Sequence, residues 1–187
     1  SMSNQLMIDG IIQIKNIFND NISKLVKEFA DEKANRKMET IGRKDFLSQR
    51  NVWGYHLLRH TPTDIWMYNL IRKEITRLYL YYKAKFPQTN NISIQQIDIL
   101  KYTKGGFYKA HTDVGSVIPR QVSIIINLND NFEGGEVFFW DQKQKNIIKE
   151  IKPFKNSVTF FPSNFLYPHS VEPVKKGVRY SIVSWLN

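Results

Sequence analysis

Residues Ile92–Tyr102 read ISIQQIDILKY, and here the periodicity of the chain changes from helical to strand-like. Five further apolar runs follow, separated by Gly, Asn, Asp and Pro: QVSIIINLN, GEVFFW, NIIKEIK, SVTFFP and VRYSIVSWL. Short β-rich runs without intervening helices are typical of an antiparallel sandwich or barrel. Residues from about 92 to 187 therefore predict a β core.

The residues before Pro87 follow a helical pattern instead. Apolar residues at helical spacing predict a first helix over about residues 21–33. A second helix is expected from Pro62 or Thr63 to Phe86, with Thr61 or Thr63 as its N-cap. Its expected apolar stripe comprises Ile65, Leu70, Ile71, Ile75, Leu78 and Tyr82. The fold class is thus α+β, with helical support over about residues 1–90 and one domain over residues 1–187.

Composition limits the kind of protein and the kind of metal site. The chain has 187 residues and is 42% hydrophobic, which favours a globular domain. It contains no cysteine, so disulfides and thiolate metal sites are excluded and any metal must be held by His, Asp or Glu. The net charge of +10 comes from lysines spread along the chain, which favours general solubility over nucleic-acid binding. Without an apolar run of roughly 20 residues or a signal-peptide pattern, we expect a cytoplasmic protein with no membrane partner.

Two histidines and one aspartate form a candidate metal site. His111 and Asp113 stand one residue apart, and His169 follows 56 residues after Asp113, in a loop expected between two late strands. Two His and one carboxylate are the ligand set of the facial triad that holds non-haem Fe(II). A His-x-Asp sequence alone also occurs in ordinary surface turns, so both interpretations are open on these residues.

The last apolar run, VRYSIVSWL, carries an arginine. Period-2 alternation places Arg179, Ser181, Val183 and Trp185 on one face of a strand. If that face points into the barrel, the Arg179 guanidinium is buried and requires an anion. The alternatives are an edge strand with Arg179 in water and a salt bridge to a protein carboxylate.

The stretch from Tyr102 to Trp185 resembles the Fe(II)- and 2-oxoglutarate-dependent oxygenases, and among them the prolyl 4-hydroxylase type. The segments that carry the resemblance are YTKGGFYKAHTD, LNDNFEGGEVFF, FFPSNFLYPHSVEPV and GVRYSIVSW. It implies a double-stranded β-helix (jelly-roll) fold buttressed by the N-terminal helices. It also implies a dioxygenase that uses Fe(II), 2-oxoglutarate and O2, with ascorbate as a reductant.

The same resemblance implies roles for individual residues. Iron would be held by His111, Asp113 and His169, and 2-oxoglutarate would be contacted by Arg179, Tyr102, Ser181 and Asn127. Arg179 suits the far carboxylate because its planar fork pairs bidentately with such a group. Asn127 stands where the family often has a tyrosine, and its amide could donate the same hydrogen bond. Tyr108 is interpreted as a core aromatic residue.

The resemblance favours proline in a peptide or protein as the substrate, hydroxylated at carbon 4. Candidate substrate residues are Asp98, which shares a strand face with Tyr102, and Trp53 and Tyr55. The two aromatic residues belong to segment Ile41–His56, interpreted either as a mobile loop over the site or as a solvated connector. Asp98 could instead meet a buried protein partner, and His56 and His60 are interpreted as structural or surface residues.

Two other activities share this chemistry. The ligands do not encode the substrate, so a free amino acid or another small molecule is an alternative. A nucleic-acid demethylase is disfavoured, because such enzymes typically continue with a second arginine six residues after the first, where this chain has Trp185.

Overall fold

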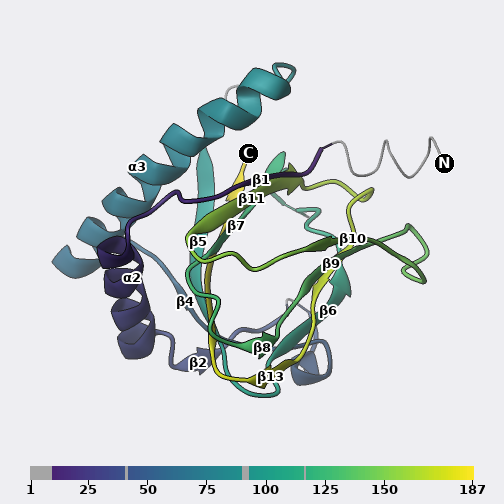
Figure 1. Cartoon of the computed structure of the whole chain (residues 1–187), viewed down its shortest axis with the longest axis horizontal. Helices are drawn as coiled ribbons and strands as arrows, with labels where there is room; N and C mark the ends of the chain where they lie inside the picture. The colour runs from purple at the N-terminus through teal and green to yellow at the C-terminus, as the bar shows by residue number, and fades with distance from the viewer. Residues whose placement is uncertain (1–9, 41, 90–92, 116) are drawn as a thin grey trace.

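The computed structural model describes residues 10–40, 42–89, 93–115 and 117–187. Two antiparallel sheets face each other and two helices lie along the outer face of the larger sheet (Figure 1). This arrangement is a double-stranded β-helix, or jelly roll, as the sequence predicts. Ile41 and Ile92, which begin two of the expected segments, lie outside the described residues.

The larger sheet has seven strands and the smaller sheet has five. In spatial order the larger sheet comprises β1 (Ile12–Ile14), β11 (Ser157–Pro162), β7 (Val122–Asn127), β14 (Arg179–Leu186), β5 (Ile94–Tyr102), β4 (Trp53–His56) and β2 (Arg36–Lys37). The smaller sheet comprises β10 (Ile147–Ile151), β9 (Val137–Trp140), β12 (His169–Val171), β6 (Phe107–His111) and β3 (Arg50–Asn51). A two-stranded ribbon pairs β13 (Val174–Lys176) with β8 (Glu133–Gly134). The six predicted strands are confirmed as β5, β7, β9, β10, β11 and β14.

Both predicted helices are confirmed. Helix α2 spans Asp20–Lys33, and the Asn19 side chain caps it by accepting from the backbone N–H of Ile22. Helix α3 spans Pro62–Lys85 and is capped in the same way by Thr61. The predicted stripe of α3 is wrong at Ile65, which is 43% exposed, because the stripe that meets the sheet begins with Met67 and continues through Ile71. No helix among the described residues has the length and apolar character needed to cross a membrane.

The two faces of the larger sheet differ in composition. The face under the helices is apolar; its buried members include Ile97, Ile99, Ile124, Ile126 and Ile182. The face toward the smaller sheet carries polar residues in register, with Arg179 opposite Tyr102 and Ser181 between Leu100 and Asn127. Because side chains alternate along a strand, the helix-packed core and the polar interior share the same strands.

The N-terminal half contributes strands as well as helices, which the sequence pattern did not predict. Strand β1 adds to the edge of the larger sheet beside β11, and β4 pairs with β5. Residues 42–56 hold the short 3-10 helix η1 (Phe46–Ser48) and strands β3 and β4. The expectation of a loop or solvated connector is therefore wrong over Arg50–Asn51 and Trp53–His56, where backbone hydrogen bonds join the segment to both sheets. His169 likewise lies on a strand rather than in a loop.

Candidate functional site

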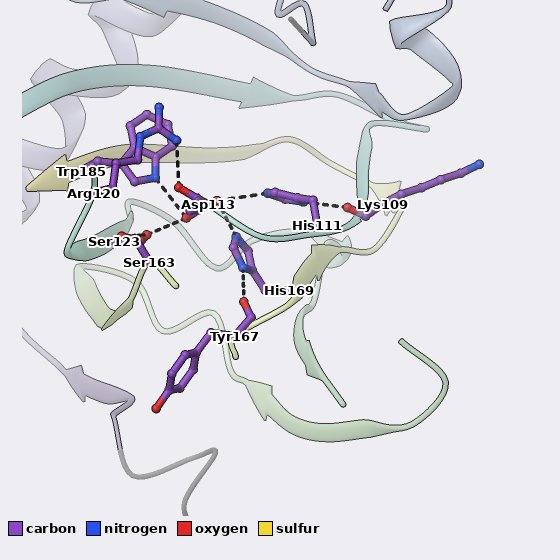
Figure 2. A network of polar contacts seen from close by, with 9 residues as sticks. All are labelled: Lys109, His111, Asp113, Arg120, Ser123, Ser163, Tyr167, His169 and Trp185. Carbon is purple, nitrogen blue, oxygen red and sulfur yellow. Dashed lines mark hydrogen bonds and ion pairs between the residues drawn. The ribbon is translucent and has the colours of Figure 1, made fainter. Parts of the chain in front are cut away.

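The three residues of the predicted triad meet between the two sheets (Figure 2). His111 ends β6 and His169 begins β12, and the two are direct partners in the antiparallel pair. Asp113 follows β6, and its Oδ1 lies 3.4 Å from Nε2 of His111 and 3.3 Å from Nε2 of His169. One ligand atom from each residue therefore lies within 4.8 Å of the others.

Hydrogen bonds fix which atoms of the triad face its centre. Nδ1 of His111 donates to the carbonyl of Lys109 at 2.8 Å, and Nδ1 of His169 donates to the carbonyl of Tyr167 at 3.0 Å. Because a carbonyl can only accept, each Nδ1 carries a proton, so in the neutral imidazole Nε2 has the lone pair that a metal requires. Backbone carbonyls commonly orient metal-binding histidines in this way.

The carboxylate of Asp113 is oriented by donors on the opposite sheet. Its Oδ2 accepts from Ser123 Oγ at 2.7 Å and from Trp185 Nε1 at 3.0 Å, which leaves Oδ1 toward the imidazoles. Ser163 Oγ lies 2.8 Å from Ser123 Oγ and extends the network. These bonds select one carboxylate oxygen for the centre of the triad, as a monodentate ligand requires.

The electrostatics of the three groups match a cation site. Burial alone would raise the pKa of Asp113, but the charge of His169 and hydrogen bonds from both imidazoles hold it well below its usual range. Burial lowers the pKa of His111, whereas Asp113 outweighs burial and raises the pKa of His169. A carboxylate and two imidazoles that share one buried point fit a divalent metal such as Fe(II).

Arg179 lies on the interior face of β14 and is 2% exposed. Its Nη1 donates to Ser181 Oγ at 3.3 Å, while its Nε is buried without a hydrogen-bond partner among the described residues. The Tyr102 ring lies 5.2 Å from the guanidinium carbon, and burial lowers the pKa of the guanidinium. In the described part of the chain no carboxylate pairs with Arg179. A buried cation without a counter-ion fits the carboxylate of a bound co-substrate.

Asn127 does not have the role expected for it. It lines a small pocket together with Arg179 and Thr159. Both amide protons are already used, because Nδ2 donates to the carbonyls of Asn129 at 2.6 Å and Phe154 at 3.1 Å. Its buried Oδ1 has no partner among the described residues and can only accept. The expectation that Asn127 donates to 2-oxoglutarate is therefore corrected.

Trp53 and Tyr55 are not brought to the site. In the pairing of β4 with β5, Trp53 lies opposite Lys101 and Tyr55 opposite Ile99, which places both on the helix-packed face. Tyr55 donates to Asp64 Oδ2 at 2.8 Å and Lys37 covers the Trp53 ring. The expectation that these two aromatic residues contact the substrate is corrected, because the sheet separates them from the triad.

Asp98 does lie on the interior face, as expected, but it has protein partners. Its Oδ1 lies 2.7 Å from Nδ1 of His56, and both of its oxygens accept from Gln96 Nε2 at 2.9–3.0 Å. The carboxylate is 2% exposed. Of the two roles left open by the sequence, the structure favours the buried partner.

The structure adds residues that sequence reasoning missed. Arg120 donates to the carbonyl of Asp113 at 3.4 Å, and its guanidinium carbon lies 4.0 Å from the Trp185 ring. The Tyr108 ring stacks on His111 with centroids 3.6 Å apart, and the guanidinium carbon of Arg50 lies 4.2 Å from the centre of that ring. Trp185 had a sequence signal, since it shares the face of Arg179 in an alternating strand. Tyr108 packs against the core, as the sequence predicts, and in addition stacks on His111.

Comparison with known proteins agrees with this geometry. Residues 97–187 match the model of the 2OG-Fe(II) oxygenase superfamily. A 66-residue segment is 36% identical to human prolyl 3-hydroxylase 2 and covers 35% of this chain but 9% of that protein. The chain thus spans about a tenth of the length of the relatives that it matches in sequence.

Solved structures resemble the chain over nearly its whole length. A prolyl-4-hydroxylase of Pseudomonas putida is 16% identical with a TM-score of 0.71, covering 98% of this chain and 97% of that one. A prolyl hydroxylase of Trichoplax adhaerens, solved with a peptide fragment of hypoxia inducible factor, is 19% identical with a TM-score of 0.73. The alignment covers 98% of this chain and 86% of that one. At this identity the likeness establishes the shared fold.

Proposed function

We propose that this chain, whose residues 97–187 match the model of the 2OG-Fe(II) oxygenase superfamily, hydroxylates a prolyl residue of a peptide or protein at carbon 4 of the ring. The observation that carries the proposal is the cluster of His111, Asp113 and His169, together with a buried Arg179 guanidinium that has no counter-ion among the described residues. Bound Fe(II) would supply O2 activation coupled to conversion of 2-oxoglutarate into succinate and CO2, with one oxygen atom transferred to the substrate.

The chain's own residues contribute binding and orientation. The two imidazoles and Asp113 Oδ1 would hold the metal, with their angles set by the carbonyls of Lys109 and Tyr167 and by the donors on Asp113 Oδ2. Arg179 would bind the far carboxylate of 2-oxoglutarate. Aromatic rings at His169, from Phe139 and Phe161, exclude water from one side of the site.

A peptide substrate is supported by groups beside the metal site. Arg120 is half-buried, stacks on Trp185 and has no ion pair among the described residues, so its guanidinium can donate to a substrate carbonyl. The structural neighbours include prolyl hydroxylases, one of them solved with a peptide. Hydroxylation at carbon 3 is the second candidate, because the sequence relatives are prolyl 3-hydroxylases.

The test is incubation of the purified protein with Fe(II), 2-oxoglutarate, ascorbate and a library of proline-containing peptides. We expect succinate release and the addition of one oxygen atom to proline, with fragmentation and amino-acid analysis separating 4-hydroxyproline from 3-hydroxyproline. His169→Ala serves as the inactive reference. Oxygen addition to a free amino acid, or loss of the alkyl group from an alkylated oligonucleotide as an aldehyde, with no oxidation of any peptide, would replace the prolyl assignment.

A further inference from the structure

A groove lies between the end of β4 and the start of β5 and has no role in the proposed chemistry. Its volume is about 710 Å³, within the range of ligand-binding pockets. One wall is formed by the residues from His56, which ends β4, to His60, and the other by the start of β5, including Gln95 and Gln96. Tyr68 of α3 also lines it.

Two contacts connect this groove to the metal ligands. Gln95 Oε1 accepts from Arg120 Nε at 3.0 Å, and Arg120 also donates to the carbonyl of Asp113. Gln96 lies directly opposite Trp185 in the β5–β14 pair, and the Trp185 indole donates to Asp113 Oδ2. Gln95 and Gln96 thus link the groove to the groups that orient Asp113.

The ionisable groups that line the groove favour an anion. They include His56, Arg59 and His60, and no lining residue is acidic. Arg59 forms no ion pair within the described ranges, and its guanidinium carbon lies 4.9 Å from the Tyr68 ring, which holds it at the groove. An exposed arginine without a protein counter-ion is available to a carboxylate of a ligand.

His56 is oriented by a carboxylate beneath the groove. Its Nδ1 faces the buried Asp98 at 2.7 Å, while the side chain is 58% exposed. The opposite edge of the ring, with Nε2, is therefore the part that a ligand can reach. The hydrogen bond with Asp98 raises the pKa of His56, so the imidazolium form, which has an Nε2–H donor, persists to higher pH than in a free imidazole.

We propose that this groove is a second binding site for the peptide substrate, which takes an acidic side chain flanking the target residue through Arg59 and His56. The proposal rests on the proposed function in requiring a peptide substrate. The net charge of +10 supports it by attracting acidic chains from a distance, in a salt-dependent way. The side-chain contacts at Arg59 and His56 add local specificity to that general attraction.

The experiment measures the equilibrium binding of two labelled peptides by fluorescence anisotropy. Both carry a central proline, and their flanking residues are glutamate in one and glutamine in the other. We expect the acidic peptide to bind wild type more tightly, and Arg59→Glu to raise its Kd about tenfold, since the change removes one attraction and adds a repulsion. The same substitution should raise the Kd of the neutral peptide less than about threefold.

Lys143→Glu is the matched control, because it makes the same charge change at an exposed turn between β9 and β10. We expect it to leave the Kd of the acidic peptide within about twofold of wild type, since Lys143 is not one of the residues that line the groove and solvent screens exposed charges. An equal loss of affinity for the acidic peptide in Arg59→Glu and Lys143→Glu would mean that only net charge matters, and it would overturn the proposal. Equal binding of the acidic and neutral peptides would overturn it as well, as would tighter, Arg59-dependent binding of an oligonucleotide of equal charge.

Turnover of the same peptides separates this proposal from the proposed function. If wild type binds the acidic peptide through Arg59 but oxidises no peptide, the proposal that the groove binds acidic peptides is supported and the prolyl assignment is wrong. If peptides are hydroxylated with the same KM whatever their flanking charge, the prolyl assignment stands and the groove proposal fails.

Discussion

The two faces of the larger sheet carry different tasks although the same strands build them. On β14, Arg179 and Ser181 point to the interior, whereas Ile182 points to the helices. Ile99 and Ile126 surround Ile182 with apolar contacts, but the interior face leaves a guanidinium without a counter-ion among the described residues. The comparison indicates that one face supplies stability and that the other gives up stability for ligand binding.

Truncation on the apolar face should have the largest effect on folding. Ile126 is fully buried under the helices, so Ile126→Ala should lower the free energy of unfolding by about 2–5 kcal/mol through lost transfer energy and a residual cavity. Val183→Ala, a truncation at a half-buried interior position, should cost less than about half as much. Urea unfolding of both variants checks the difference. A larger loss of unfolding free energy in Val183→Ala than in Ile126→Ala would contradict the conclusion that the helix-packed face supplies the stability.

Replacement of Arg179 should separate binding from stability. Arg179→Lys keeps the charge but loses the planar fork, and we expect it to weaken 2-oxoglutarate binding by about 1–3 kcal/mol. Arg179→Met should abolish that binding yet raise the free energy of unfolding of the ligand-free protein by roughly 1–4 kcal/mol, because it removes a buried, unpaired charge. Calorimetric titration and urea unfolding test the pair. Unchanged 2-oxoglutarate affinity in both variants would show that Arg179 serves only the protein's own structure.

Two buried serines on opposite faces provide a matched pair. Ser123 donates to the metal ligand Asp113, whereas Ser184 donates to the carbonyl of Gln96. Ser123→Ala should lower Fe(II) affinity at least about tenfold, since it frees the carboxylate to rotate. Ser184→Ala should leave Fe(II) affinity unchanged and cost about 1 kcal/mol of stability. Anaerobic metal titration distinguishes them, and equal affinities in the two variants would contradict a role for Ser123 in orienting Asp113.

The smallest expected effect is a pH dependence from His56. Its hydrogen bond with Asp98 raises the pKa of His56 in the folded state, against burial and the charge of Arg50. The pair therefore stabilises the fold at low pH, and this contribution is lost as pH rises through the raised pKa. The stability advantage of wild type over His56→Gln should be larger at about pH 5.5 than at about pH 8.5. Urea unfolding at both values measures it, and an advantage that grows with pH would contradict this pairing.

Much of the interior face could be predicted from the sequence. Alternation in VRYSIVSWL placed Arg179 and Ser181 on one face, and the order of His111, Asp113 and His169 along the chain indicated the triad. These predictions succeeded because a period of two is a local property of a strand and because the ligand types restrict the chemistry.

The failures share a physical cause, which is long-range pairing. Alternation puts Trp53 and Tyr55 on one face of β4, but only the register of β4 against β5 decides whether that face points to the helices or to the interior. This register pairs residues that are distant in sequence, such as His56 and Asp98, which are 42 residues apart. Asn127 looked like a donor because nothing local reveals that the carbonyl of Phe154, 27 residues away, competes for its amide. Ser123 and Ser163 were missed for the same reason, since their hydrogen bond joins residues 40 apart and the bond from Ser123 to Asp113 depends on how the two sheets face each other.

The most direct test of the site is Fe(II)-dependent binding of 2-oxoglutarate under anaerobic conditions, measured by calorimetry on wild type, His169→Ala, Asp113→Ala and the exposed control Asp130→Ala. We expect wild type and Asp130→Ala to bind one equivalent of 2-oxoglutarate more tightly when Fe(II) is present. Both triad variants should lose this Fe(II)-dependent gain and remain folded, because an open site of this kind contributes less to stability than a structural metal does. Wild-type binding of Fe(II) and 2-oxoglutarate by His169→Ala would contradict the assignment of the metal centre.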